Sequence, residues 1–504
     1  MFVRELKNVN GRTYIQVVSK TAGKYKVLKS FGGARDRDSI QRLISQAQNW
    51  INLQKGNIEL DLYSEIAQYT SFTEHISGLK LAGIELLLGN VFDQIGFSAI
   101  EDELFKSLVL YRLVYPRSKL KTTEYLFRYE HKEVSVDTIY RYMDKLHSSQ
   151  KDLIQQISYT HTREVLKEAI QIVFYDVTTI YFEIDREDDL RKTGFSKEGK
   201  HQHPQIVLGL LVSMSGYPLA YDIFEGNQFE GKTMLPVIEA FKKKFHLEKL
   251  LIVADSGLLS KEIIALLIEK VYEFLLGARI KNESQLLKEK ILALSLKDNQ
   301  SKVLRKGELR LIVSYSERRA KKDAHNRERG LKRLEKRLAK GKLTKAHLNQ
   351  RGYNKYLILD GDVKVSIDYN KYNQDAKWDG LKGYITNSSL SKDILLAHYR
   401  QLWQIEKAFR IAKSELNIRP VFHRLQKRIE AHICLCFAAY KVYKELERQL
   451  LEKNADISPA KAIEIAQSIF EIEIITPNTK QKIAKVLLLK KEQKVLAQLF
   501  QFGC

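Results

Sequence analysis

The sequence predicts an α/β protein with a central sheet, a β-rich insertion and helical regions at both ends of the chain. Three apolar runs, at 169–183, 205–214 and 217–226, follow one another, and a helical segment separates them from a fourth run at 249–260. Their continuous apolar and β-branched character is typical of strands that are covered on both faces. Strands and helices that alternate in this way indicate the α/β class.

The N-terminal part of the chain predicts a hairpin followed by helices. Residues 14–31 alternate between apolar and polar side chains and are interrupted at 21–23, so we expect two antiparallel strands there. A helix is expected over 39–53, and the pattern from 79 to 147 is helical throughout. This part therefore combines a small sheet with a helical region.

The last helix of that region is a candidate for reading DNA. Ser135 is a suitable N-cap, and Thr138, Arg141 and Lys145 follow along the exposed side of the expected helix. Three further cations that could contact phosphates precede it: Arg117, Lys119 and Lys121. A small DNA-recognition unit that uses Arg141 and a plain helical bundle are both compatible with this pattern.

Two of the buried-type strands carry an aspartate, Asp176 inside or at the end of its strand and Asp255 at the end of its own. Asp176 and Asp255 each lie where an apolar run gives way to small polar residues. An unpaired charge at such a position is costly, so each carboxylate needs partners. Hydrogen bonds from Thr178, Thr179 or the next turn would satisfy Asp176 alone. Two such aspartates, together with Glu406 on a helix that packs on the core, form a candidate metal site.

An insertion is expected between Asp255 and Glu406, because far more residues lie between them than one strand and one helix use. We place it at about 281–379, with alternating strand patterns at both ends and a stretch dense in Lys and Arg between them. A helix in that stretch would carry leucines on one side and cations on the others: Leu331, Leu334 and Leu338 against Lys332, Arg333, Lys336 and Arg337. We favour an arm that tracks DNA phosphates over a solvated hairpin packed on its own protein.

A single helix is expected over 397–416. Its apolar residues recur at the three-and-four spacing of a face that packs on a core. Tyr399, Glu406 and Lys413 are seven residues apart, so they form a second stripe, with Arg410 beside them. This stripe holds a carboxylate at the border of the buried face and flanks it with cations. Ordinary charge pairs on a surface helix are the alternative.

The formal net charge is +23 over 504 residues. Such an excess indicates an extended anionic partner, and nucleic acid is the leading candidate. A basic enzyme without such a partner remains the alternative.

The N-terminus does not look like a signal peptide, and no apolar run approaches the roughly 20 residues that span a bilayer, so we expect a cytoplasmic protein with no membrane partner. The three cysteines, Cys434, Cys436 and Cys504, suit neither a disulfide framework nor a zinc site.

The stripe at 399–413 resembles the C-terminal signature of DDE transposases of bacterial insertion sequences. That signature is a tyrosine, two residues, an arginine, three residues, the catalytic glutamate, six residues and a lysine. Tyr399, Glu406 and Lys413 fall on it, whereas Leu402 stands in the arginine position. Two neighbouring residues are candidates for the phosphate contact of that arginine: Arg400 and Arg410. The similarity extends over about 172–440 and includes the segment of the first catalytic aspartate, at Asp176.

The resemblance implies a ribonuclease H-like core with a mixed sheet and a transposase that binds its element ends, cleaves DNA and transfers strands. It implies two Mg²⁺ ions, with Mn²⁺ as a substitute; Asp176 would bridge both ions, and Asp255 and Glu406 would each complete one shell. It also implies DNA contacts by Tyr399, Arg400, Arg410 and Lys413. The expected partners are double-stranded DNA, as terminal inverted repeats and as target, and a second copy of the chain. The protein would associate with the bacterial nucleoid when bound.

Two other functions remain open at this point. A metal-dependent, structure-selective nuclease would need the same carboxylates, and an inactive DNA-binding regulator would need only the basic surface. We predict five parts of the chain: an N-terminal hairpin and helical DNA-binding region at 1–165, the first part of the catalytic core at 166–280, the β-rich insertion with its basic arm at 281–380, the second part of the core with the Glu406 helix at 381–440, and a C-terminal helical region at 441–504.

Overall fold

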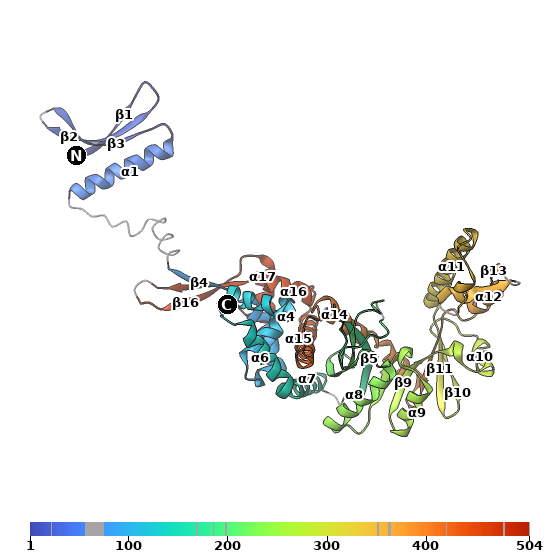
Figure 1. Cartoon of the computed structure of the whole chain (residues 1–504). Helices are drawn as coiled ribbons and strands as arrows, with labels where there is room; N and C mark the ends of the chain where they lie inside the picture. The colour runs from blue at the N-terminus through green and yellow to red at the C-terminus, as the bar shows by residue number, and fades with distance from the viewer. Residues whose placement is uncertain are drawn as a thin grey trace. The chain divides into compact units, whose positions relative to one another are not determined.

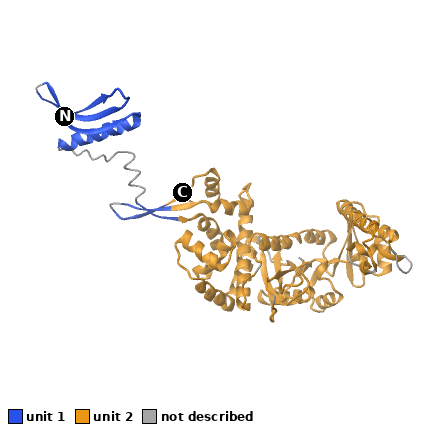
Figure 2. Ribbon diagram, turned by 45° about the horizontal axis from the view of Figure 1, so that its top comes forward, with its two compact units in different colours: residues 1–79, 472–484 blue, residues 80–471, 485–504 orange. Residues whose placement is uncertain are grey.

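The computed structural model describes residues 1–21, 23–55, 75–167, 170–184, 186–196, 199–349, 352–360, 364–419, 421–476 and 479–502. The chain divides into two compact units, which Figure 2 shows in different colours. The smaller unit holds residues 1–79 and 472–484, and the larger holds 80–471 and 485–504. Each unit has core residues of its own.

The smaller unit contains an antiparallel sheet in the order β1-β2-β3, with helix α1 packed on it (Figure 1). The elements are β1 (Phe2–Lys7), β2 (Thr13–Thr21), β3 (Lys24–Ala34) and α1 (Arg37–Gln54). The core that they share contains Ile15, Val17, Ala47 and Ile51. The predicted hairpin and helix are confirmed, and β1 adds a third strand.

The expectation of a wholly helical C-terminal region is wrong, because two strands interrupt it. The elements there are α15 (Gln426–Glu452), α16 (Pro459–Ala466), β15 (Phe470–Ile475), β16 (Lys482–Leu487) and α17 (Lys491–Phe500). The two strands join β4 (Ile76–Leu81) in the order β16-β15-β4. The sequence of β15 alternates glutamate with Phe or Ile, and this period of two is typical of a strand.

The larger unit is built around an eight-stranded sheet in the order β10-β11-β14-β9-β8-β5-β6-β7. Its strands are β5 (Ile172–Tyr181), β6 (Gln205–Ser213), β7 (Pro218–Glu225), β8 (Leu251–Ala254), β9 (Glu273–Ala278), β10 (Ser301–Lys306), β11 (Leu309–Tyr315) and β14 (Leu381–Thr386). The pairs β5–β8 and β8–β9 are parallel and the others are antiparallel. The predicted α/β fold with a mixed sheet is confirmed.

Helices pack on both faces of this sheet. One face carries α8 (Glu230–Lys244) and α9 (Lys261–Glu269), and the other carries α13 (Lys392–Arg400), α14 (Trp403–Ser414) and α15. Along β5, Tyr175 and Val177 belong to the core on the α8 side, whereas Phe174 and Ile180 belong to the core on the α14 side. Because side chains alternate along a strand, Asp176 points toward the α14 side.

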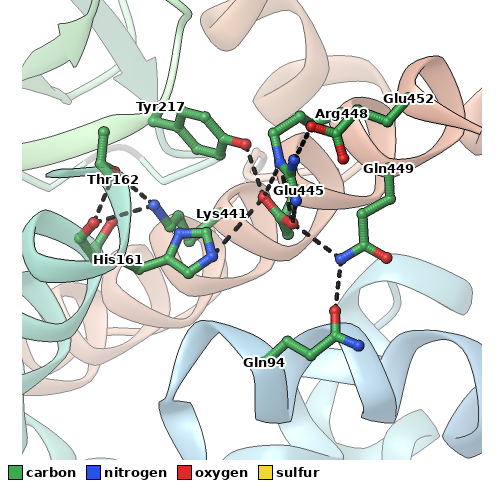
Figure 3. Close-up of polar contacts among 10 residues, drawn as sticks. Gln94, His161, Thr162, Tyr217, Lys441, Glu445, Arg448, Gln449 and Glu452 are labelled. Atoms are coloured by element: carbon green, nitrogen blue, oxygen red, sulfur yellow. Dashed lines mark hydrogen bonds and ion pairs between the residues drawn. The ribbon is translucent and has the colours of Figure 1, made fainter. Parts of the chain in front are cut away.

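Helix α15 is buried along most of its length and carries a polar network, drawn in Figure 3. The ammonium of Lys441 donates to Oγ1 of Thr162 at 2.6 Å and to the carbonyl of Ser158 at 3.0 Å. The carboxylate of Glu445 accepts a hydrogen bond from the Tyr217 hydroxyl at 2.7 Å. Buried charges are tolerable because each has partners. In the same helix Cys434 and Cys436 are buried, as expected, while Cys504 lies outside the described residues.

A helical region precedes β5 and packs on α15. Its α-helices are α3 (Asn90–Ile95), α4 (Glu103–Val114), α5 (Lys119–Glu130), α6 (Val136–Lys145) and α7 (Lys151–Leu166), with short π-helical turns at Glu85–Gly89 and Leu146–Gln150. Ser135 caps α6, accepting a hydrogen bond from the Thr138 amide at 3.1 Å, as predicted. None of the helices described is both long enough and apolar enough to cross a membrane.

The insertion contributes strands to the central sheet and also forms a small module of its own. Strands β10 and β11 extend the sheet, and α10 (Gln285–Leu292) packs beside them. The module consists of α11 (Glu317–Ala339), the hairpin β12 (Leu357–Asp360) with β13 (Lys364–Ile367), and α12 (Tyr369–Ala376). The predicted apolar side of the basic helix is confirmed, since Leu331, Leu334 and Leu338 pack in the module's core. The limits predicted for the five parts of the chain stay predictions.

Candidate active site

The segment predicted as one helix over 397–416 is two helices, so that prediction is wrong. Helix α13 ends at Arg400 and α14 begins at Trp403. Between them, the amides of Gln401 and Leu402 bond to carbonyls three residues back rather than four, which tightens the turn. Leu402 stays buried at this turn. Tyr399 and Glu406 therefore lie on different helices and not on one stripe.

The two predicted aspartates lie on neighbouring parallel strands. The last residue pair in the register between β5 and β8 is Tyr175 with Ala254, so Asp176 and Asp255 occupy the next position of each strand. The backbone at Asp255 is still extended, with φ −79° and ψ 165°. Neighbouring strands are about 4.8 Å apart. The fold therefore brings together two carboxylates that are distant in the sequence.

Glu406 lies in the first turn of α14, which packs on β5 and β6. Its side chain is exposed, whereas Ile405 and Phe409 of the same helix are buried against the sheet. The helix covers the face toward which Asp176 points. All three predicted carboxylates are therefore associated with one side of the sheet.

Tyr399 is 5% exposed, and its hydroxyl donates a hydrogen bond to Oδ1 of Asp255 at 3.0 Å. Burial raises the pKa of Tyr399 most, and the negative charges of Asp255 and Glu406 raise it further. This contact gives Tyr399 a role beside a carboxylate that the sequence did not predict. Its predicted contact with DNA stays a prediction.

Lys382 on β14 is a cation at this site that the sequence did not predict. Its ammonium lies 4.5 Å from the ring centroid of Tyr399. Burial and then Arg319 lower the pKa of Lys382, whereas Asp255 and Glu406 raise it. One lysine thus experiences the charge of two of the three predicted carboxylates.

Asp255 opens into a pocket of about 370 Å³ that is rich in cations. The basic residues that line it are Arg279, Lys281, Arg319 and Lys382. They come from the end of β9, from α11 and from β14, so no local sequence pattern could have grouped them. A cationic pocket beside a carboxylate suits a phosphodiester substrate.

The donor set suits hard divalent ions, because all three predicted ligands are carboxylates. Asp176 and Asp255 are neighbours, and Oδ1 of Asp176 accepts a hydrogen bond from the Val177 amide at 2.8 Å. Within the described ranges, no three His, Cys, Asp or Glu side chains are already gathered closely enough to hold a metal ion. The site thus has the appropriate oxygen donors on one side of the sheet without a preformed cluster.

The other predicted DNA contacts are spread over the larger unit. Arg400 and Arg410 are exposed and Lys413 is half-buried. Arg141 is exposed on α6, which packs on α5 and α15. On α11, Lys332, Arg333 and Lys336 are exposed and Arg337 is half-buried. Lys119 is an exception: it is 4% exposed, so its expected phosphate contact does not lie on the open surface and stays a prediction.

The family model described as "Transposase DDE domain" matches residues 167–441, which is more than half of the chain. The chain belongs to this family. This DDE transposase is therefore a phosphoryl-transfer enzyme that catalyses DNA cleavage and strand transfer, and its mixed sheet is the ribonuclease H-like catalytic core. Enzymes of this family use divalent metal ions.

Solved structures of transposases resemble this one weakly. A synaptic complex of piggyBac transposase with hairpin DNA has 9% identity over 79% of each chain and a TM-score of 0.38. A Mos1 transposase paired-end complex with the left transposon end has 11% identity over 36% of this chain and 57% of that chain, with a TM-score of 0.16. A Mos1 mariner paired-end complex with Mn has 12% identity over 46% of this chain and 67% of that one, with a TM-score of 0.15. No curated protein matches the sequence.

Proposed function

We propose that this transposase moves a bacterial insertion sequence and that Asp176, Asp255 and Glu406 form its catalytic centre. The observation that carries the proposal is the register of β5 and β8, which makes the two aspartates neighbours. Glu406 supports it, because its helix packs on the same side of the same strand. The three carboxylates are far apart in the sequence, and the fold, not the amino-acid composition, brings them to one side of the sheet.

Cleavage of a phosphodiester requires an activated oxygen nucleophile and a stabilised leaving oxygen. Two Mg²⁺ ions, or Mn²⁺ in their place, would supply both effects by polarising the two oxygens. Asp176 would hold both ions, and Asp255 and Glu406 would each hold one. Tyr399 would keep the carboxylate of Asp255 oriented through its hydrogen bond. Lys382 and Arg319 would bind phosphate oxygens beside Asp255.

We further propose that the enzyme acts as a homodimer on paired terminal inverted repeats and then on target DNA. Phosphate contacts near the carboxylates would come from the cations of α13 and α14: Arg400, Arg410 and Lys413. Arg141 on α6 and the cations of α11 would extend the contact along the duplex. Contacts to phosphates do not distinguish one DNA sequence from another, so recognition of the end sequence also requires contacts to bases.

Strand transfer from a duplex with a free 3′-hydroxyl end to a target plasmid tests the proposal. Asp176→Asn, Asp255→Asn and Glu406→Gln should each abolish cleavage and transfer while binding of the end DNA stays within about threefold, since ligands of one site act together. Glu415→Gln, an isosteric change just beyond α14, is the matched control and should retain activity. Cleavage without transfer by the wild-type protein would indicate a nuclease. A variant of the three that retained activity would remove that residue from the site.

A further inference from the structure

A second cationic pocket lies between the helical region and the segment that follows α14. Its volume is about 370 Å³, and it is bounded by α4, α5, α6, α15 and the segment after α14, through residues 417, 419 and 421–423. The basic side chains that line it are Arg112, Arg117, Lys119, Arg419, His423 and His432, and none of the described lining residues is acidic. This composition distinguishes it from the pocket beside Asp255, which contains a carboxylate.

Two of these cations are buried without a carboxylate. Arg112 on α4 is 6% exposed, and its Nε has no hydrogen-bond partner in the described part of the chain. Lys119 on α5 is 4% exposed. Burial lowers the pKa of both, Arg112 lowers that of Lys119 further, and Cys436 opposes both shifts; no carboxylate of the described residues acts on either. Buried cations that lack a counter-charge are expensive, so the pocket is organised for an anion that comes from outside the chain.

The two histidines that line the pocket, His423 and His432, supply no negative charge to balance its cations. Nε2 of His432 lies 3.1 Å from the carbonyl of Ile418, and its buried Nδ1 has no partner among the described residues. Burial, Lys119, Arg112 and Arg428 together lower the pKa of His423 to about 3. The charges of Lys119, Arg112 and Arg428 thus add to burial in lowering this pKa, and a bound anion would offset them.

The pocket is connected to the strand that carries the first aspartate. The guanidinium carbon of Arg419, which lines the pocket, lies 5.8 Å from the ring centroid of Tyr181. Tyr181 is the last residue of β5 and follows Asp176 by five positions, or about 17 Å of extended chain. One strand of duplex DNA covers that length in about five nucleotides. A DNA strand at Asp176 can therefore reach the neighbourhood of this pocket.

We propose that this pocket binds a backbone phosphate of the transposon-end DNA, a few nucleotides from the bond that is cleaved, through Arg112 and Lys119. The phosphate replaces the missing counter-charge by accepting charge-assisted hydrogen bonds from the two side chains. The inference uses the DNA activity of the family and the path past Asp176, but it does not depend on metal binding by the carboxylates.

The test compares Lys119→Met and Arg112→Met with Arg128→Met, which removes an exposed cation from the same helix α5. Binding of end DNA is measured by fluorescence anisotropy in excess chelator, so that catalysis plays no part. Each pocket variant should weaken binding about tenfold and flatten the slope of log affinity against log salt by about 0.9, which corresponds to one phosphate. The control should change neither by a comparable amount.

Stability of the DNA-free protein provides the second measurement. Loss of an uncompensated buried cation should leave the melting temperature of Lys119→Met unchanged or raise it, whereas loss of a merely structural lysine should lower it.

A duplex with one neutral methylphosphonate, moved stepwise through the first nucleotides beside the cleaved bond, should lose affinity at one position with the wild type and at none with Lys119→Met. Stabilisation by inorganic phosphate with an unchanged DNA salt slope would overturn the proposal, as would a folded Lys119→Met protein with wild-type affinity. Failure of the three carboxylates in the transfer assay would leave these binding results intact.

Discussion

The hydroxyl of Tyr399 donates a hydrogen bond to Oδ1 of Asp255 across 3.0 Å, from a helix to the end of a strand. If Asp255 is a metal ligand, as proposed, Tyr399 acts as a positioning residue through this carboxylate. The break between α13 and α14 makes this possible, because it lets Tyr399 lie over the sheet while Glu406 stays at the surface.

Tyr399→Phe should raise the metal concentration needed for half-maximal cleavage by about 10- to 100-fold, as is typical when the partner of a metal-binding carboxylate is removed. The maximal rate at saturating metal should change less. Cleavage titrated with Mg²⁺ measures this. Tyr384→Phe, the same change in the adjacent tyrosine, is the control and should have a normal titration. An unchanged metal dependence in Tyr399→Phe would show that the hydrogen bond has no part in orienting Asp255.

Gly277 on β9 allows this contact, so its replacement should disrupt it. A Cβ at Gly277 would lie 2.6 Å from the Tyr399 hydroxyl and 2.8 Å from the backbone nitrogen of Ser256. Gly277→Ala should lower the free energy of unfolding by about 1–3 kcal/mol, as overpacking does, and should also reduce cleavage. Urea unfolding and cleavage assays measure the two effects. Adding Tyr399→Phe should restore part of the stability, because one of the two clashes disappears.

Gly257→Ala is the control for that experiment, since a Cβ there meets nothing within 4 Å. This variant should unfold at the wild-type urea concentration. Equal destabilisation by both glycine variants would mean that the loss comes from the glycine backbone itself and not from contact with Tyr399.

The sequence made the two aspartates and Glu406 candidates, because each lies where an apolar pattern meets polar residues and because their segments resemble those of DDE transposases; their catalytic role stays a prediction. It could not predict Lys382 or Arg319 as their neighbours, since these arrive through β14 and α11 of the insertion. The break after Arg400 was also hidden. Leu402 fits the apolar spacing of a continuous helix equally well, and only the three-residue hydrogen bonds of the turn distinguish the two cases.

The burial of Lys119 was missed for a similar reason. A lysine beside Arg117 and Lys121 suggests a solvated basic surface, but it packs toward Arg112, which lies within an apolar stretch of α4. The arginine in that stretch was the available signal, because a cation among buried residues requires a partner. In the proposal above, that partner is a phosphate of the DNA.

The catalytic reading predicts which metal ions support activity. Mg²⁺ and Mn²⁺ should support cleavage, and Zn²⁺ should substitute poorly, because three carboxylates suit hard octahedral ions. Cleavage assays with each ion after dialysis against chelator provide the measurement. Full activity in excess chelator would end the metal-dependent mechanism.

His161 should make the stability of the larger unit depend on pH. Burial, Lys441 and Arg448 lower its pKa to about 4, although Glu445 opposes the shift. The unfolded chain, with an ordinary histidine pKa near 6.5, therefore binds a proton before the folded chain does. Stability is fully present above about pH 6.5 and is lost as the pH falls toward 4, by at most about 3 kcal/mol.

Urea unfolding between pH 4 and 8 measures this loss. His161→Gln, which cannot titrate, should remove a corresponding part of the decline while leaving the rest of the profile. His147→Gln is the control, because His147 is half-buried and lies in the π-helical turn Leu146–Gln150, whereas His161 lies in α7. Identical pH profiles for the wild type and His161→Gln would exclude this histidine as the source.

The last prediction concerns the basic helix α11. If it tracks phosphates, replacing Lys332, Arg333, Lys336 and Arg337 by glutamine should weaken binding to specific and non-specific DNA alike. Each lost contact should flatten the salt slope by about 0.9. Lys332 is paired with Glu328 at 2.7 Å, so it should contribute least. Folding should survive, because the leucines that pack in the module's core are unchanged and exposed charges contribute little to stability.

The matched control removes the same charge from the face of the sheet that carries α8 and α9. It replaces four lysines that are exposed on or beside these helices: Lys243, Lys249, Lys261 and Lys270. A general effect of net charge would weaken both variants equally, whereas a phosphate-tracking arm would weaken only the α11 variant strongly. If the α11 variant kept both the wild-type salt slope and cleavage, the helix would be a solvated structural element. The excess positive charge would then have to act through the cations around Asp255 and through the pocket of Arg112 and Lys119, which has no acidic residue among its described lining.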